Sequence, residues 1–343
     1  MASTIALVAS AAVIGVWLLL VLAGVSMFGG GPLAVVLGLF ILGIAAISRP
    51  RLGSKPEGAV ARADAPELYA LVDEVATTLK APKVHVIAID GDWNAMTTRY
   101  GPLQRTTIVF GLPLWHGLSD PARLAVLGHE VGHSVNGDTS RGFLEGTALR
   151  TLETWSVITE PPELVTDEGL VALASIPANL VMLGLSSFFG SLSSALQLVL
   201  LRPRLQAEFY ADRLGAAVAG APAMADALDG LRLDRAYVRA VASVATNDRP
   251  ILELFAEVRT QIASTPPSEL ERLRRQEARP PFDHDASHPP FNERIAMVER
   301  RASPGPPLLD IDPARMRAID AELARLEPRV ARELVEEYLA EIS

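Results

Sequence analysis

The chain has 343 residues, a formal net charge of −9 and no cysteine. Its length suffices for one large domain or two small ones. The negative charge argues against nucleic-acid binding, and the lack of cysteine excludes disulfide bonds, cysteine metal ligands and thiol nucleophiles. A hydrophobic fraction of 49% argues against a disordered or fibrous chain.

Two apolar segments open the chain. No charged side chain precedes Arg49, and residues 5–28 exceed the roughly 20 apolar residues that a helix needs to cross a bilayer. The sequence Gly-Gly-Gly-Pro at 29–32 ends that helix, and residues 33–48 are long enough to return. We therefore predict a transmembrane helical hairpin over residues 1–48. A cleaved signal peptide fits less well, because a basic start is missing and a second apolar segment follows directly.

Arg49, Arg51 and Lys55 come directly after the hairpin. Basic residues beside membrane segments are enriched on the cytoplasmic side. We therefore expect these three residues in the cytoplasm, and an even number of crossings places the N-terminus there too.

Helical and strand-like patterns fill most of the remaining chain. Apolar side chains at helical spacing predict helices over residues 65–80, 120–136, 204–219, 223–245, 250–264, 292–301 and 313–342, with one further short helix within 265–290. The β-branched segments 84–89 and 106–110 predict two strands. We expect Asp120 to be the N-cap of its helix, Gly137 to end that helix, and Pro328 to interrupt the last one.

The helix over 120–136 contains the sequence H-E-V-G-H at residues 129–133. Because His129 and His133 are four positions apart, they lie on one helix face, where both imidazoles can bind one Zn²⁺. Glu130 can reach a water molecule beside the metal, as the general base of a metalloprotease must. An ordinary histidine pair on a helix surface is the alternative, but small neighbouring residues leave room for close packing and for a ligand.

A catalytic zinc ion usually has three protein ligands, so a third ligand must follow downstream. His284, His288 and any buried acid are candidates. Glu208 stands out among the acids, because Asp212 follows one helical turn later and could hold a ligand histidine by its second ring nitrogen. A pair of acids on a solvated helix face is the alternative.

Several motifs follow one another in a specific order. They are Pro82-Lys83-Val84, Asn94-Ala95-Met96, Gly111-Leu112, Gly128-His129-Glu130-Val131-Gly132-His133, Asn136-Gly137-Asp138, Glu208-Phe209-Tyr210-Ala211-Asp212 and Ser287-His288-Pro289-Pro290 with Arg294. Together with the hairpin, this order resembles the HtpX-like membrane zinc metalloproteases, relatives of the CAAX prenyl endopeptidase. The resemblance covers about residues 5–300, and the ordered set is far more specific than H-E-x-x-H alone.

The resemblance implies a mainly α fold with a small β-sheet, an α+β zincin-like metalloprotease domain behind the membrane hairpin. We expect the hairpin over 1–48, the protease domain over 49–303 with an apolar helical insertion at 169–201, and a C-terminal helical tail over 304–343. The strand over 106–110 would be the edge strand that receives an extended peptide substrate.

The resemblance also assigns the site. The residues that it implies are His129, His133 and Glu208 as ligands of one Zn²⁺ per chain, Glu130 as general base, and Asn136, Asp212, His288 and Arg294 around them. We expect His288 to stabilise the tetrahedral oxyanion. Asn136, Asp212 and Arg294 are expected to support the ligands or to face the substrate. The other histidines, His85, His116 and His284, are expected to bind no metal.

The sequence departs from the family between the H-E-x-x-H helix and Glu208. Relatives usually carry two further membrane segments there, but residues 142–162 contain four charged side chains and are a poor span. Because both ends of this region must reach one metal, it crosses the membrane either twice or not at all. We expect residues 169–201 to form a helical pair, broken near Pro177 or within 184–190, that packs beside the hairpin or dips into the membrane.

The sequence thus predicts a multi-pass zinc endopeptidase of the plasma membrane with its catalytic domain in the cytoplasm. Its expected partners are the lipid bilayer and peptide or misfolded membrane-protein substrates, in membrane-protein quality control. One alternative is a prenyl-protein endopeptidase, which needs more membrane spans than this chain offers. The other is a catalytically silent membrane scaffold, which would have no physical reason to keep both histidines and both glutamates of the site.

Overall fold

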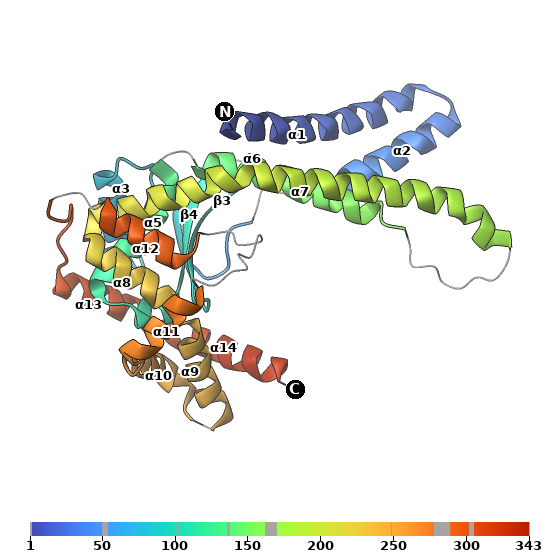
Figure 1. Ribbon diagram of the computed structural model, residues 1–343. Coiled ribbons are helices and arrows are strands. Elements are labelled where there is room, and N and C mark those ends of the chain that lie inside the picture. Colours follow the sequence, from blue (N-terminus) through green and yellow to red (C-terminus); the bar gives the residue numbers. More distant parts are fainter. Residues whose placement is uncertain are drawn as a thin grey trace. The chain divides into compact units, whose positions relative to one another are not determined.

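The computed structural model describes residues 2–49, 54–101, 103–135, 138–161, 170–247, 249–277, 289–301 and 305–342. It confirms the predicted fold class, because this part of the chain is mainly helical with one small sheet (Figure 1). The chain divides into two compact units, Met1–Leu52 with Ser140–Arg204 and Gly53–Thr139 with Leu205–Ser343. The domain boundaries after residues 48 and 303 remain predictions.

The first unit begins with the predicted hairpin. Helices α1 (Ala2–Ser26) and α2 (Pro32–Ile47) are joined by a 3-10 turn, Met27–Gly29. Trp17 Nε1 donates a hydrogen bond to the Ala45 carbonyl oxygen at 2.8 Å. A Cβ on Gly38 would lie 2.7 Å from the Gly24 carbonyl oxygen, so glycine is what allows the two backbones to approach.

The longest helix, α7 (Leu170–Ala219), shows that the expected break in the charge-free segment is wrong. The helix runs without interruption through Pro177 and Pro203. A proline removes one main-chain hydrogen bond, but apolar helices tolerate it where a neighbouring helix packs alongside. Of the described helices, two are long and apolar enough to cross a membrane, over Ser10–Gly29 and Asn179–Ala219.

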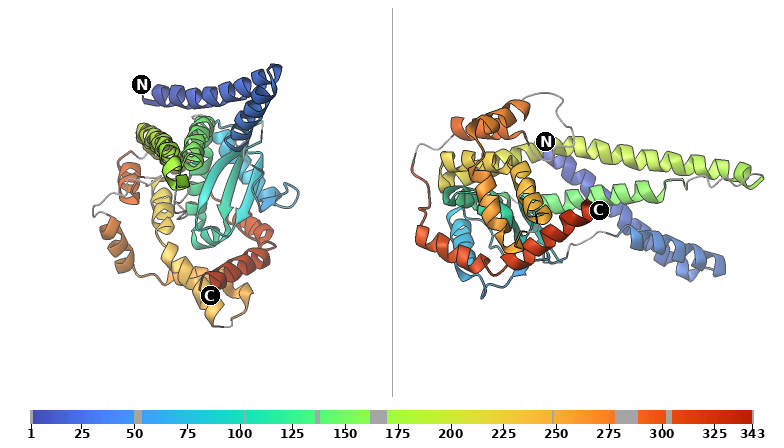
Figure 2. Two further views of the ribbon diagram at one scale, coloured as in Figure 1. Left: turned by 90° about the vertical axis from the view of Figure 1, so that its right-hand side faces the viewer. Right: turned by 90° about the horizontal axis from the view of Figure 1, so that it is seen from below.

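Helix α6 (Asp138–Ile158) is the neighbour of α7 within the first unit (Figure 2). Ser156 Oγ donates to the Ser186 carbonyl oxygen at 3.0 Å. Apolar side chains of α6 and α7 enclose a small core with Val13 of α1; they are Ala148, Leu149, Leu152, Trp155, Leu196 and Leu200. The helical pair is therefore α6 with α7, rather than two halves of residues 169–201.

The second unit contains a four-stranded sheet in the order β1-β2-β4-β3. Its strands are β1 (Ala59–Val60), β2 (Val86–Asp90), β3 (Ala95–Tyr100) and β4 (Arg105–Gly111). Strands β2 and β4 are parallel, and the outer pairs are antiparallel. The expectation that residues 106–110 form an edge strand is wrong, because β4 pairs on both sides. The two edges are β1 and β3, and the sequence patterns missed both.

The second unit also contains the remaining helices, of which α4 and α5 contact the sheet directly. They are α3 (Pro66–Thr78), α4 (Leu112–Gly117), α5 (Asp120–Val135), α8 (Ala221–Leu231), α9 (Asp234–Thr246), the 3-10 turn η2 (Ile251–Glu253), α10 (Leu254–Ala263), α11 (Pro267–Glu277), α12 (Phe291–Arg300), α13 (Pro313–Leu323) and α14 (Glu327–Glu341). The helix expected over 223–245 is two helices. The helix expected over 313–342 is also two helices, α13 and α14. Pro328 does not interrupt a helix but lies in the first turn of α14, where its missing N–H is harmless.

Helices α13 and α14 are part of the core of the second unit. Ile319, Leu323 and Val330 are fully buried in it. The Glu322 carboxylate accepts the N–H groups of Glu67 and Leu68 at 2.8 and 3.1 Å and so caps α3. The C-terminal helices therefore stabilise the second unit directly.

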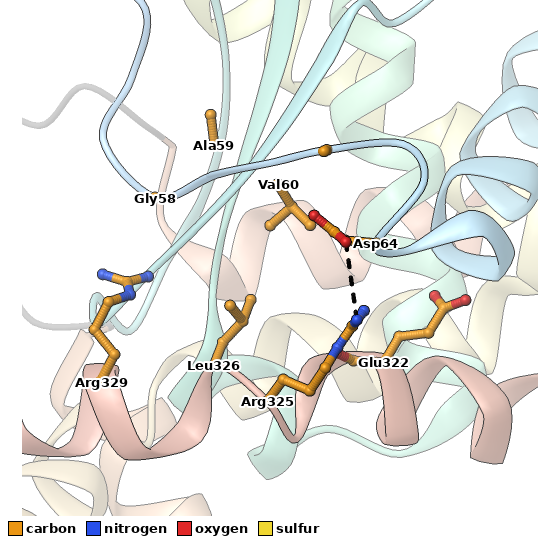
Figure 3. Close-up of a pocket in the computed structure, with 9 residues that line it drawn as sticks. Gly58, Ala59, Val60, Asp64, Glu322, Arg325, Leu326 and Arg329 are labelled. Carbon is orange, nitrogen blue, oxygen red and sulfur yellow. Dashed lines mark hydrogen bonds and ion pairs between the residues drawn. The ribbon is translucent and has the colours of Figure 1, made fainter.

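A cavity of about 310 Å³ lies between residues 58–64 and the corner that joins α13 to α14 (Figure 3). Arg325 lies 4.0 Å from Asp64 on one side, and Arg329 donates to the Ile89 carbonyl oxygen at 3.2 Å on the other. Gly58 has φ +69°, and a Cβ there would lie 2.1 Å from the Ile89 oxygen. Only glycine therefore fits the tight entry into β1.

Candidate metal centre

Helix α5 presents the two histidines of the H-E-V-G-H sequence. It begins at Asp120, and Ser119 precedes it with Oγ 3.4 Å from the Ala122 nitrogen, so Ser119 stands where Asp120 was expected to cap the helix. His129 and His133 lie one turn apart, with ring centroids separated by 4.7 Å. The spacing in the sequence is thus realised as one helix face.

Two glycines of α5 bring the C-terminal part of α7 against this face. A Cβ on Gly128 would lie 3.0 Å from the Gly215 Cα, and a Cβ on Gly132 would lie 3.3 Å from the Ala211 Cα. Larger residues at either position would therefore press against the α7 backbone. This close approach is what carries Glu208, on α7, to the two histidines.

Three nitrogen and oxygen donors converge at this contact. His129 Nε2 lies 3.1 Å from His133 Nε2, and the two nitrogens lie 3.8 and 3.5 Å from the carboxylate oxygens of Glu208. Donors at about 2.0–2.1 Å from one tetrahedral zinc ion are about 3.3 Å apart. The observed separations match that value, and two imidazoles with one carboxylate are a donor set that zinc prefers. The residues present therefore fit a zinc ion.

Asp212 lies against His129, the first of the candidate ligands. Its Oδ1 lies 2.9 Å from His129 Nδ1, which leaves Nε2 directed at the other donors. Arg294 donates to both oxygens of Asp212 at 2.7 and 2.8 Å, and it lies 3.4 Å from Glu208. Asp212 is fully buried and Arg294 nearly so, which makes this a buried, bidentate ion pair.

The charges of this group shift the protonation of its members. Burial alone would raise the pKa of the Asp212 carboxyl, but the hydrogen bonds from Arg294 and His129 hold that pKa well below its usual range. Burial by itself would lower the pKa of His129. The hydrogen bond and the negative charge of Asp212 have the larger combined effect, so the pKa of His129 is raised. Asp212 therefore remains ionised at neutral pH and orients the His129 ring.

Glu130 is nearly buried beside the three donors. Thr97, on strand β3, donates its hydroxyl to the Glu130 carbonyl oxygen at 2.8 Å and lies 3.0 Å from Glu130 Oε2. The sequence patterns assigned no role to Thr97. The only signal was its position directly after the Asn94-Ala95-Met96 motif.

The structure thus brings six of the eight expected site residues together: His129, Glu130, His133, Glu208, Asp212 and Arg294. Asn136 and His288 lie outside the described residues, so their expected roles remain predictions. Among the described residues, His129, His133 and Glu208 are the one group able to hold a metal ion. His116 lies elsewhere, between Arg259 and Glu327.

Comparisons with known proteins agree with this geometry. The sequence profile of peptidase family M48 matches residues 62–302. A protein named "Protease HtpX homolog" from Pyrobaculum aerophilum is 28% identical over 242 residues, which are 68% of this chain and 67% of that protein. One of the same name from Pyrobaculum calidifontis is 29% identical over 68% of each chain. A third, from Bacillus pumilus, is 30% identical over 58% of this chain and 64% of its own.

Proposed function

The chain belongs to peptidase family M48, whose profile covers well over half of its length, and we propose that it is a zinc-dependent endopeptidase with several membrane spans. The family and the apolar helices identify it as a membrane-associated metalloprotease. The observation that carries the proposal is the convergence of His129, His133 and Glu208 within 4.8 Å of one another, with Glu130 beside them.

In this proposal His129, His133 and Glu208 hold one zinc ion, which when bound polarises a scissile carbonyl and increases the acidity of a water molecule. Glu130 accepts a proton from the attacking water and passes it to the leaving amine. His288 stabilises the negative oxygen that develops during attack. Asp212 and Arg294 keep the His129 ring in place.

The edge strand β3 is the element that best suits an extended substrate. Among the described residues it pairs with β4 alone, and Thr97 joins it to Glu130. A peptide that adds to this edge by main-chain hydrogen bonds would pass beside the donors. This assigns to β3 the role that the sequence had suggested for residues 106–110.

The setting of the reaction follows from the apolar helices. We place the α1–α2 hairpin and the apolar part of α7 in the plasma membrane, and the second unit in the cytoplasm, as the basic residues Arg49 and Lys55 after the hairpin suggest. Substrates would be peptides or misfolded membrane proteins, in quality control of the bilayer. The relatives' printed name, "Protease HtpX homolog", supports the proteolytic part of this proposal.

The test compares detergent-purified wild type with Glu130→Gln, which keeps the shape of the side chain but cannot accept a proton. We expect one zinc per chain in both proteins and casein cleavage only in the wild type. Glu336→Gln, at an exposed position on α14, is the matched control and should cleave like the wild type. Cleavage by Glu130→Gln at the wild-type rate would refute the base, and wild type without zinc would refute the ligand set.

A further inference from the structure

The side chain of Thr97 joins the edge strand to the expected general base. Its hydroxyl lies 2.8 Å from the carbonyl oxygen of Glu130 and 3.0 Å from Glu130 Oε2. Thr97 is half-buried on β3, and Glu130 is nearly buried on α5. One hydroxyl therefore contacts both the backbone and the carboxylate of the same residue, across two elements.

The chemistry of a hydroxyl suits this position. It carries one proton and two lone pairs, so it can donate to a carboxylate and can also accept from a carboxylic acid. Glu130 passes through both forms when it takes up a proton and releases it. The carbonyl oxygen of Glu130 remains a second acceptor for the Thr97 proton, so the contact persists in either form.

We propose that Thr97 is a positioning residue, whose hydroxyl fixes the Glu130 carboxylate relative to the strand that pairs with the substrate. This inference rests on the proposed peptidase function. A peptide bound along β3 and a base tied to β3 keep one mutual geometry, and small errors in such geometry reduce rates strongly. The alternative is a purely structural threonine that only satisfies the Glu130 carbonyl group.

The experiment uses the full-length, zinc-loaded enzyme and compares two substitutions at this site. Thr97→Val keeps the shape and removes the hydroxyl, whereas Thr97→Ser keeps the hydroxyl and removes the methyl group. We expect Thr97→Val to lower kcat by about ten-fold or more, with KM and zinc content close to wild type. Thr97→Ser should retain most of kcat, which a role in packing would not produce.

Thr107→Val is the matched control. Thr107 lies in the middle strand β4, fully buried, and its hydroxyl contacts no hydrogen-bonding group among the described residues. It should therefore leave kcat unchanged. A wild-type kcat in Thr97→Val, or an equal loss in Thr97→Ser, would overturn the proposal. An inactive wild type would instead refute the proposed function.

A second readout does not depend on turnover. Thr97→Val, Glu130→Ala and the double variant form a cycle whose melting temperatures report the coupling between the two side chains. We expect Thr97→Val to lower the melting temperature less in the Glu130→Ala background than in the wild type, because the carboxylate contact is already absent. Additive shifts would overturn the proposal even if no substrate were cleaved.

Discussion

Asp212 is the residue on which the geometry of the candidate metal centre depends most. Its two oxygens are shared between His129 Nδ1 and the guanidinium of Arg294, and the carboxylate is completely buried. A buried carboxylate that keeps its charge needs partners of this kind. The ion pair therefore supports one metal ligand and at the same time joins α5, α7 and α12.

We predict that Asp212→Asn weakens zinc binding by roughly ten- to hundred-fold, because the amide no longer holds the His129 ring with a full charge. It also leaves the Arg294 charge without its carboxylate. The measurement is competition for zinc with a chelator of known affinity. Asp226→Asn is the control: Asp226 is exposed on α8, where it accepts a hydrogen bond from Ser119, and its substitution should not change zinc affinity. Equal affinity in wild type and Asp212→Asn would contradict the role.

At this scale the sequence predicted most of the site. The spacing of His129 and His133 fixes a helix face, and Glu208 with Asp212 repeats that spacing on a second helix. Thr97 could not be found in this way, because a contact between a strand and a helix leaves no periodic signal. Arg294 and Asp212 are 82 residues apart in the sequence, so local sequence patterns could not predict their bidentate contact either.

At the scale of elements, exposure decided which predictions succeeded. Strand β4 is almost wholly buried, and its β-branched residues were recognised as a strand. Strand β3 is an edge with threonines and an arginine, and its pattern resembles a loop. In α7 the break expected near Pro177 or within 184–190 is absent, and the helix continues through both places. Pairing with β4 outweighed the local sequence pattern at β3.

Charged groups join the start of helix α5 to the C-terminal helices. Asp320 of α13 accepts hydrogen bonds from Arg123 at 3.1 Å and from Trp115 Nε1 at 2.8 Å. Beside them, Arg259 donates a hydrogen bond to His116 Nδ1 at 2.8 Å. The proton of the neutral imidazole is therefore on Nε2, which lies 3.1 Å from Glu327 Oε1. His116 is therefore buried in its neutral form.

This arrangement predicts a specific pH dependence. Burial, with the nearby charges of Arg259 and Arg123, lowers the pKa of His116 to about 4. Below pH 6.5 the unfolded chain gains a proton at this residue that the folded protein does not accept. Stability is therefore lost as the pH falls from about 6.5 to about 4, by up to roughly 3 kcal/mol.

The measurement is the free energy of unfolding of wild type and His116→Gln in detergent between pH 7.5 and 4.5. Glutamine keeps two hydrogen-bonding groups but does not titrate, so the wild type should lose stability relative to the variant as the pH falls. Burial raises the pKa of Glu327, which acts in the opposite direction in both proteins. Parallel curves would show that His116 is accessible to protons in the folded state.

At the scale of the whole molecule, the metal centre constrains the path of the chain. His129 and His133 precede Ser140–Arg204, the second segment of the first unit, and Glu208 follows it. Both ends of that segment must therefore lie on one side of the membrane. The sequence alone predicted that both ends lie on one side of the membrane. It did not predict that the two helices of the pair are α6 and α7.

We predict that the pair crosses the bilayer twice. Helix α6, with 21 residues, is about 32 Å long, which matches a hydrocarbon core of about 30 Å, and α7 is longer. The charges of α6 oppose insertion, since Arg150 and Glu153 are exposed and only Glu145 is buried, but a crossing by α7 requires a second crossing to return the chain to the same side. Residue 166, between the two helices, should then lie on the opposite side from Lys55 and Gly305.

The absence of cysteine makes this prediction directly measurable, because single cysteines can be introduced without background. Lys55→Cys, Thr166→Cys and Gly305→Cys are labelled with a membrane-impermeant maleimide in intact cells and in inverted vesicles. Thr166→Cys should react only in intact cells, and the other two only in inverted vesicles. If all three react from the cytoplasmic side, the α6–α7 pair lies on the membrane surface, because two crossings necessarily carry residue 166 outside.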